Sequence, residues 1–183
     1  DVDAETVDRS IAYGDVVGNF ILEWLANDHY ADTRQMDWTL PTGDASYWVP
    51  TEPNQEAVEP YWGLIRPFVL PEAGICEVPQ QIVFSTEPGS AFYQQALEVK
   101  TVSEQLTQDQ REISRFWVDT PGVTGTPAGH WILIGSQMVD LLDLNLADAA
   151  RMYLVVGVSV GDAFISAWET KYQDNLLRPV TYI

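Results

Sequence analysis

Apolar side chains recur at the three- and four-residue spacing of an α-helix along most of this chain. The predicted helices cover residues 6–28, about 90–102, 108–117 and 130–142. Thr107 and Gln110 form a capping-box pattern that marks the start of the third of these helices. Residues 81–84 are a candidate for a short strand. The pattern therefore predicts an all-α fold, a helical bundle.

The longest apolar pattern lies near the end of the chain. It predicts a helix of about thirty residues that begins at Asn145, the expected N-cap, and runs to Leu177. Residues 147–168 leave few polar faces, so we expect this helix to be central and buried nearly all round. Its apolar stretch, 152–168, is about one residue short of a membrane span and contains an aspartate, so we expect a protein that does not span a membrane.

A proline-rich segment separates the first helix from the others. Seven prolines interrupt residues 36–79, which predicts extended, irregular chain. The segment is also rich in Trp and Tyr, so we expect it to wrap around the helices with its aromatic side chains against them. The chain of 183 residues, 46% of them hydrophobic, is expected to form one helical domain over residues 1–183.

The charge of the chain limits its partners. The formal net charge of −18 argues against nucleic acids and anionic membranes as partners. Any anion site must be a local positive pocket, which makes the nine Lys and Arg residues informative. The acidic, polar start of the chain is what a mature exported protein shows, and we expect a periplasmic or extracellular location. Cys76, the single cysteine, excludes an internal disulfide and is expected to be buried.

Two of the few basic residues lie close together near the end of the chain. Lys171 and Arg178 are seven residues apart, about two turns of a helix, so their side chains share a face and can converge on one oxyanion. Pro179 disfavours helical geometry at Arg178, so we expect the helix to end there. The alternative is an ordinary surface ladder of ion pairs between these two residues and Asp174.

The wider sequence has a family likeness. The Lys171-x6-Arg178-Pro179 pattern resembles the first signature of the vanadium-dependent haloperoxidases, which share a helical fold with the type-2 phosphatidic acid phosphatases. Four stretches resemble the bacterial haloperoxidase-like branch, and the likeness covers about residues 60–183. They are YWGLIRPF from Tyr61, PGSAFYQQALEVK from Pro88, FWVDTPGVTGTPAGHW from Phe116 and GDAFISAWETKYQDNLLRPVTYI from Gly161.

The resemblance implies a site for small anions. Lys171 and Arg178 would hold the oxygens of vanadate, or of phosphate in a phosphatase, and Trp168 would line a halide pocket or pack in the core. The family's Pro-Ser-Gly-His stretch and its later Arg and His follow the first signature and are absent from residues 1–183. We therefore expect the chain to be the N-terminal part of a larger haloperoxidase-like domain, with negligible activity by itself.

Both histidines have simpler interpretations than catalysis. Thr126-Pro127-Ala128-Gly129-His130 resembles the Pro-Ser-Gly-His stretch, but it has Ala for Ser and precedes the Lys-Arg signature. We expect His130 to be a packed or capping residue. His29 lies between Asp28 and Asp32, and we expect a solvated helix end there and no metal site.

Three functions remain open at this point. The first is part of a vanadium haloperoxidase-like enzyme, in which peroxide drives halide oxidation at bound vanadate. The second is an acid phosphatase that uses the same oxyanion site, and the third is a non-catalytic helical module. Expected partners are vanadate or phosphate, halide, peroxide and the remaining part of the same protein. The sequence leaves open whether the protein forms an oligomer.

Overall fold

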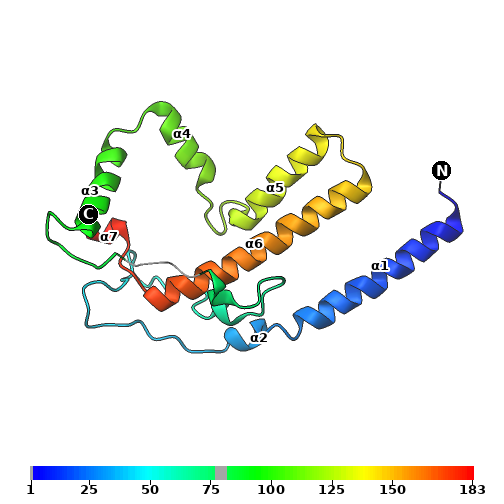
Figure 1. The fold of residues 1–183 in the computed structure, drawn as a ribbon, viewed down its shortest axis with the longest axis horizontal. Helices are drawn as coiled ribbons and strands as arrows, with labels where there is room; N and C mark the ends of the chain where they lie inside the picture. The colour runs from blue at the N-terminus through cyan, green and yellow to red at the C-terminus, as the bar shows by residue number, and fades with distance from the viewer. Residues whose placement is uncertain (1, 77–81) are drawn as a thin grey trace.

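A computed structural model describes residues 2–76 and 82–183, and its described residues are helical or irregular, without a β-strand. Figure 1 shows an open arrangement of helices around one long helix. The α-helices are α1 (Ala4–Leu25), α2 (Tyr30–Thr33), α3 (Ala91–Glu104), α4 (Gln108–Trp117), α5 (Thr126–Leu141), α6 (Leu146–Asp174) and α7 (Pro179–Tyr182). Two short 3₁₀ helices are η1 (Trp62–Leu64) and η2 (Ala73–Ile75). The all-α prediction is confirmed.

Local sequence signals place several helix ends. The Asn145 side chain accepts hydrogen bonds from the backbone N–H groups of Ala147 and Asp148, so the predicted N-cap of α6 is confirmed. Thr107 and Gln110 form the predicted reciprocal capping box at the start of α4. Helix α5 begins earlier than predicted, at Thr126, because Pro127 occupies the first turn, where its missing N–H costs nothing.

Helix α6 is the element around which the others are arranged. Helix α5 packs beside it after a tight reversal, and η1 and η2 of the proline-rich segment lie against it (Figure 1). Ile65, Ala73 and Ile165 form a small core with Trp62 beside it. The proline-rich segment therefore lies against the long helix, as its aromatic content predicts.

A buried carboxylate joins the two elements. Asp162 on α6 is 5% exposed and accepts three backbone hydrogen bonds, from Phe68 at 2.6 Å, Val69 at 2.8 Å and Leu70 at 2.9 Å. Burial by itself raises the pKa of Asp162, but the three N–H donors stabilise the charged form and hold the pKa below its ordinary value. This one side chain fixes the backbone of residues 68–70 on the helix.

The end of α1 is held by an arginine of the same segment. The Arg66 guanidinium lies 3.8 Å from the centre of the Trp24 ring and donates a hydrogen bond of 2.5 Å to the Trp24 carbonyl oxygen. Trp24 also stacks on Phe68, with 5.0 Å between the ring centres. The rest of α1 projects away from the other helices and has no buried residue (Figure 1).

Two burial predictions are wrong. Among the described residues, α6 buries only Ala149, Asp162, Ile165 and Ser166, because α5, η1 and η2 cover part of its surface and the rest is open. Cys76 is exposed, because it follows η2 at the edge of the segment and packs into no core. The predicted strand at 81–84 lies partly outside the described residues, and 82–84 form none.

Helix α6 is long and apolar enough to cross a membrane when only its length and composition are considered. Its best 18-residue window has a mean hydropathy of 1.3, and 17% of that window is buried. The core helix of a water-soluble protein meets the same criterion, so the helix is weak evidence of a span. The expectation of a protein that does not span a membrane therefore stays a prediction.

Gly63 in η1 allows the proline-rich segment to approach α6 closely. A Cβ atom at this position would lie 2.7 Å from the Cα of Glu169, and a backbone atom cannot move aside as a side chain can. We expect Gly63→Ala to lower the free energy of unfolding by about 1–3 kcal/mol, measured by urea unfolding. Gly14→Ala is the control, because no atom lies within 4 Å of a Cβ there and α1 should gain slightly in stability. Equal stability of the wild type and Gly63→Ala would contradict the close approach.

Candidate functional site: a cavity with two basic residues at the end of the long helix

The predicted end of the long helix is wrong by three to four residues. Helix α6 ends at Asp174, because Asn175 adopts a left-handed conformation with φ 45° and ψ 39°. The chain then pairs with residues 46–48: Trp48 N–H donates to the Asn175 carbonyl at 2.8 Å, and Leu177 N–H donates to the Ser46 carbonyl at 2.7 Å. Arg178 therefore lies beyond the helix in extended backbone before Pro179.

Lys171 and Arg178 nevertheless line the same cavity, of about 350 Å³. Its other walls come from Trp48 and residues 55–58 of the proline-rich segment and from the turn after α6. The two basic residues meet across this turn and not along one helical face. The sequence reasoning missed the contribution of Trp48 and residues 55–58, because no local pattern in an irregular segment shows which helix end it will cover.

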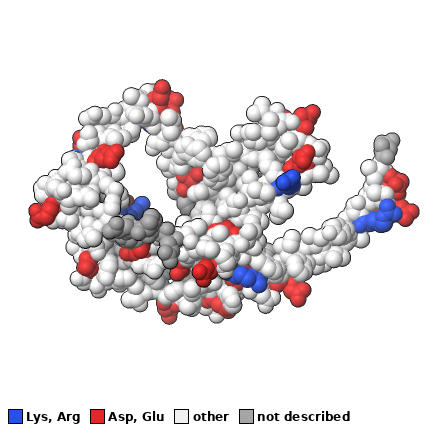
Figure 2. Space-filling view, viewed as in Figure 1, with Lys and Arg blue, Asp and Glu red and all other residues white. Residues whose placement is uncertain are grey.

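The alternative of a surface ion-pair ladder is not observed. Among the described residues, no ion pair joins Asp174 to Lys171 or to Arg178. Acidic side chains are spread over the face that Figure 2 shows, and basic ones are few there, as in the sequence. The two positive charges thus line one cavity, with Glu56 as the single acidic residue in its lining.

Lys171 lies among aromatic rings. Its ammonium nitrogen is 4.3 Å from the centre of the Trp168 ring and 5.4 Å from that of the Tyr172 ring. Partial burial lowers the pKa of Lys171 below its ordinary value, and the positive charge of Arg178 lowers it further. The two positive charges are therefore close enough to repel each other.

The same two aromatic residues fix the segment that covers the cavity. Trp168 Nε1 donates a hydrogen bond of 3.0 Å to the Val58 carbonyl oxygen, and the Tyr172 hydroxyl donates one of 2.7 Å to the same atom. Burial raises the pKa of Tyr172, so its hydroxyl stays protonated and keeps donating. Trp168 thus contacts Lys171 and Val58, while its suggested place in a halide pocket stays a prediction.

One polar group in the cavity wall was not expected from the sequence. The side-chain amide nitrogen of Asn175 is buried and has no hydrogen-bond partner among the described residues, and Asn175 lines the cavity with Lys171 and Arg178. Buried donors are rarely left without an acceptor. The signal that could have identified it is the position of an Asn between the Lys and the Arg, where it ends the helix.

The histidines lie elsewhere. His130 is packed, as predicted: its ring contacts those of Phe116 and Trp117, and its Nδ1 is 3.0 Å from Asp119 Oδ2. His29 Nδ1 is 3.3 Å from Asp32 Oδ2 on an exposed turn. The described part of the chain contains no group of three or more His, Cys, Asp or Glu residues that could hold a metal ion.

Comparisons with known proteins bear on this architecture. No protein-family model matches the chain, and no curated protein does. A structural match was found to the crystal structure of a bacterial vanadium-dependent iodoperoxidase, with 37% sequence identity and a TM-score of 0.83. The match covers 93% of this chain and 43% of the iodoperoxidase. This chain therefore has the helical fold of the vanadium haloperoxidases over the part of that fold that it spans.

Proposed function

We propose that this chain is part of a vanadium haloperoxidase-like enzyme and supplies the Lys and Arg half of its oxyanion site. The single observation that carries the proposal is that Lys171 and Arg178 line one cavity in a chain that shares its fold with a vanadium-dependent iodoperoxidase. In a chain with a net charge of −18, two cations in one cavity, neither of them in an ion pair among the described residues, are suited to a small anion.

The residues present fit vanadate. Vanadate is a small anion with several oxygen acceptors, and the cavity offers the Lys171 ammonium, the Arg178 guanidinium and the unpartnered Asn175 amide. A Lys point charge and a planar Arg fork together neutralise the anion and fix its orientation. When bound, vanadate supplies the activation of peroxide for halide oxidation.

The chain's own residues would then bind and orient the anion. Arg178 would hold two oxygens through its fork, and Lys171 would donate a charge-assisted hydrogen bond that becomes stronger as negative charge develops on an oxygen. Trp168 and Tyr172 hold Val58 and so keep the covering segment in place. A histidine from the rest of the protein would complete the site, since neither His29 nor His130 lines this cavity.

An acid phosphatase is the second candidate, because the same Lys171 and Arg178 suit phosphate as well as vanadate. The fold shared with an iodoperoxidase favours the first candidate. We further propose that the partners are halide, peroxide and the remaining part of the same protein, and that the protein is exported. Iodide oxidation by peroxide, compared with phosphate-ester hydrolysis by the same preparation of intact protein, distinguishes the two enzymes.

The chain has only two lysines, which offers a matched test of the anion site. Lys171→Gln is expected to weaken vanadate binding about tenfold, because one charge-assisted hydrogen bond is lost, measured by isothermal titration calorimetry on the intact protein. Lys100→Gln removes the same charge from α3, outside the cavity lining, and is expected to leave the affinity unchanged. If both variants lose the same vanadate affinity, the loss comes from the change in net charge, and the proposed site is wrong.

A further inference from the structure

A second, larger cavity adjoins the one lined by Lys171 and Arg178, which is called the oxyanion cavity below. We propose that the larger cavity binds an aromatic molecule, neutral or positively charged, that accepts the halogen. The inference rests on the proposed function for the identity of the reaction, but its binding step is independent of that function. The cavity has a volume of about 680 Å³ and is open to solvent. Its size suits an aromatic ring with substituents.

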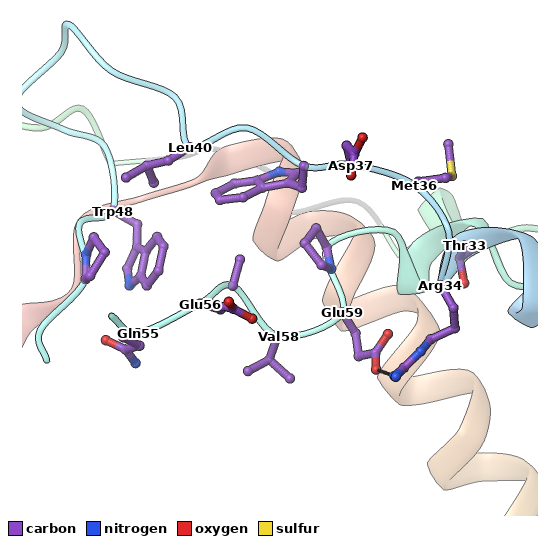
Figure 3. Close-up of a pocket in the computed structure, with 14 residues that line it drawn as sticks. Thr33, Arg34, Met36, Asp37, Leu40, Trp48, Gln55, Glu56, Val58 and Glu59 are labelled. Carbon is purple, nitrogen blue, oxygen red and sulfur yellow. Dashed lines mark hydrogen bonds and ion pairs between the residues drawn. The ribbon is translucent and has the colours of Figure 1, made fainter. Parts of the chain in front are cut away.

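The two cavities share a wall. Trp48 and residues 55–58 line both of them, so a molecule in the larger cavity lies across this wall from Lys171 and Arg178. Figure 3 shows the larger cavity as an open space with Asp37 and Leu40 on one side and Gln55, Glu56 and Val58 on the other. The larger cavity therefore lies directly beside the cavity in which the proposed oxidation would occur.

The charges of the two cavities are opposite. Lys171 and Arg178 against Glu56 leave the smaller cavity with a net charge of +1. The larger cavity is lined by Asp37, Glu56, Glu59 and Arg34, which leave a net charge of −2, and Arg34 is neutralised by its ion pair with Glu59 (Figure 3). The larger cavity thus repels anions and attracts cations, so the two cavities are suited to different ligands.

Aromatic faces are the second feature of the larger cavity. Trp38 and Trp48 both line it, with 6.3 Å between their ring centres and 54° between their planes. Trp38 is held edge-on against Tyr172 of α6, at 5.6 Å. Indole faces beside carboxylates attract aromatic and ammonium groups, through stacking and through the negative face of the ring.

The shared wall is held in place from both sides. Trp168 and Tyr172 both donate to the Val58 carbonyl, and the Gln55 side-chain oxygen accepts hydrogen bonds from Thr51 N at 2.8 Å and Thr51 Oγ1 at 3.1 Å. A wall with fixed ends keeps both cavities preformed, which lowers the entropy lost when a ligand binds.

The reaction balances with the reagents of the proposed function. Peroxide, halide and a proton yield hypohalous acid and water, so peroxide is the oxidant. The aromatic carbon then attacks the halogen: the C–X bond forms, the O–X bond breaks, and the displaced hydroxide leaves as water with the proton lost from the ring. A neutral or cationic phenol meets both requirements, since it is electron-rich at its ring and is not repelled by Asp37 and Glu56.

Three phenols that differ in charge test the proposal: tyramine, p-cresol and 4-hydroxyphenylacetate, titrated into residues 1–183 and followed by tryptophan fluorescence. We expect tyramine to bind about tenfold more tightly than 4-hydroxyphenylacetate, with p-cresol between them. Asp37→Asn is expected to reduce that ratio about threefold, and Trp38→Leu to weaken all three phenols. Asp109→Asn on α4 is the charge control and should leave the ratio unchanged.

Equal affinities for the three phenols, or a ratio that Asp37→Asn does not change, would overturn the proposal. Asp37 and Trp38 do not line the oxyanion cavity, so vanadate titrations of the same variants separate the two proposals. Tyramine binding by residues 1–183, together with no vanadate binding by the intact protein, removes the proposed function and supports the aromatic site. Vanadate binding without discrimination among the phenols removes the aromatic site alone. Circular dichroism shows whether Trp38→Leu is misfolded. If it is, the effect of Asp37→Asn on the ratio of phenol affinities decides whether the aromatic site exists.

Discussion

Asp162→Ala is expected to lower the free energy of unfolding by about 2–4 kcal/mol, because a hydrogen bond to a charged group contributes roughly 1.5–3 kcal/mol and donors left without an acceptor add a penalty. The change leaves the backbone N–H groups of residues 68–70 without their acceptor and removes the link between that segment and α6. Asp162→Asn keeps the shape but turns an N–H₂ group toward the donors, so it should also be destabilising. Urea unfolding followed by circular dichroism measures both.

The loss should depend on pH in one direction. The pKa of Asp162 is below its ordinary value in the folded chain, so its contribution to stability is full above the unfolded-state pKa of about 3.9. It is lost as the pH falls through the folded-state pKa, and the stabilities of wild type and Asp162→Asn should then approach each other. Asp8→Ala on exposed α1 is the control, with a change within about 0.5 kcal/mol. A difference that stays constant with pH would contradict the charged hydrogen-bond network.

Arg178→Ala is expected to weaken vanadate binding about tenfold to a hundredfold, since a charge-assisted hydrogen bond contributes roughly 1.5–3 kcal/mol. Arg178→Lys should cost less, because it removes the bidentate fork but keeps the charge. Vanadate titration by calorimetry on both variants measures the difference. Because Arg178 is exposed at the start of α7, both variants should fold as the wild type does.

Asp174→Ala is the matched comparison for Arg178→Ala. Asp174 ends α6 and makes no ion pair with Lys171 or Arg178 among the described residues, so its removal should leave vanadate affinity nearly unchanged. An ion-pair ladder would instead make Asp174→Ala as harmful as Arg178→Ala. Unchanged affinity in Arg178→Ala would remove the anion-site proposal altogether.

The sequence by itself determined the helical elements and singled out the two residues proposed to hold the anion. Helix starts at Asn145 and Thr107 depend on side chains that cap their own backbone, and the apolar spacing along α6 follows from helical geometry. The scarcity of basic residues in a chain of net charge −18 singled out Lys171 and Arg178. These signals are local, so a linear pattern contains them.

Only the tertiary structure decided how these residues meet. Helix α6 ends at Asp174 because Asn175 adopts the left-handed conformation and pairs with Trp48, which brings Arg178 to the cavity around a turn. Contacts between positions more than ninety residues apart decide which irregular segment covers the site. Contacts of the same kind let Asp162 hold residues 68–70. The exposure of Cys76 and of most of α6 likewise depends on which elements pack where. Residue type sets only a preference for burial, and packing partners that are distant in sequence decide it.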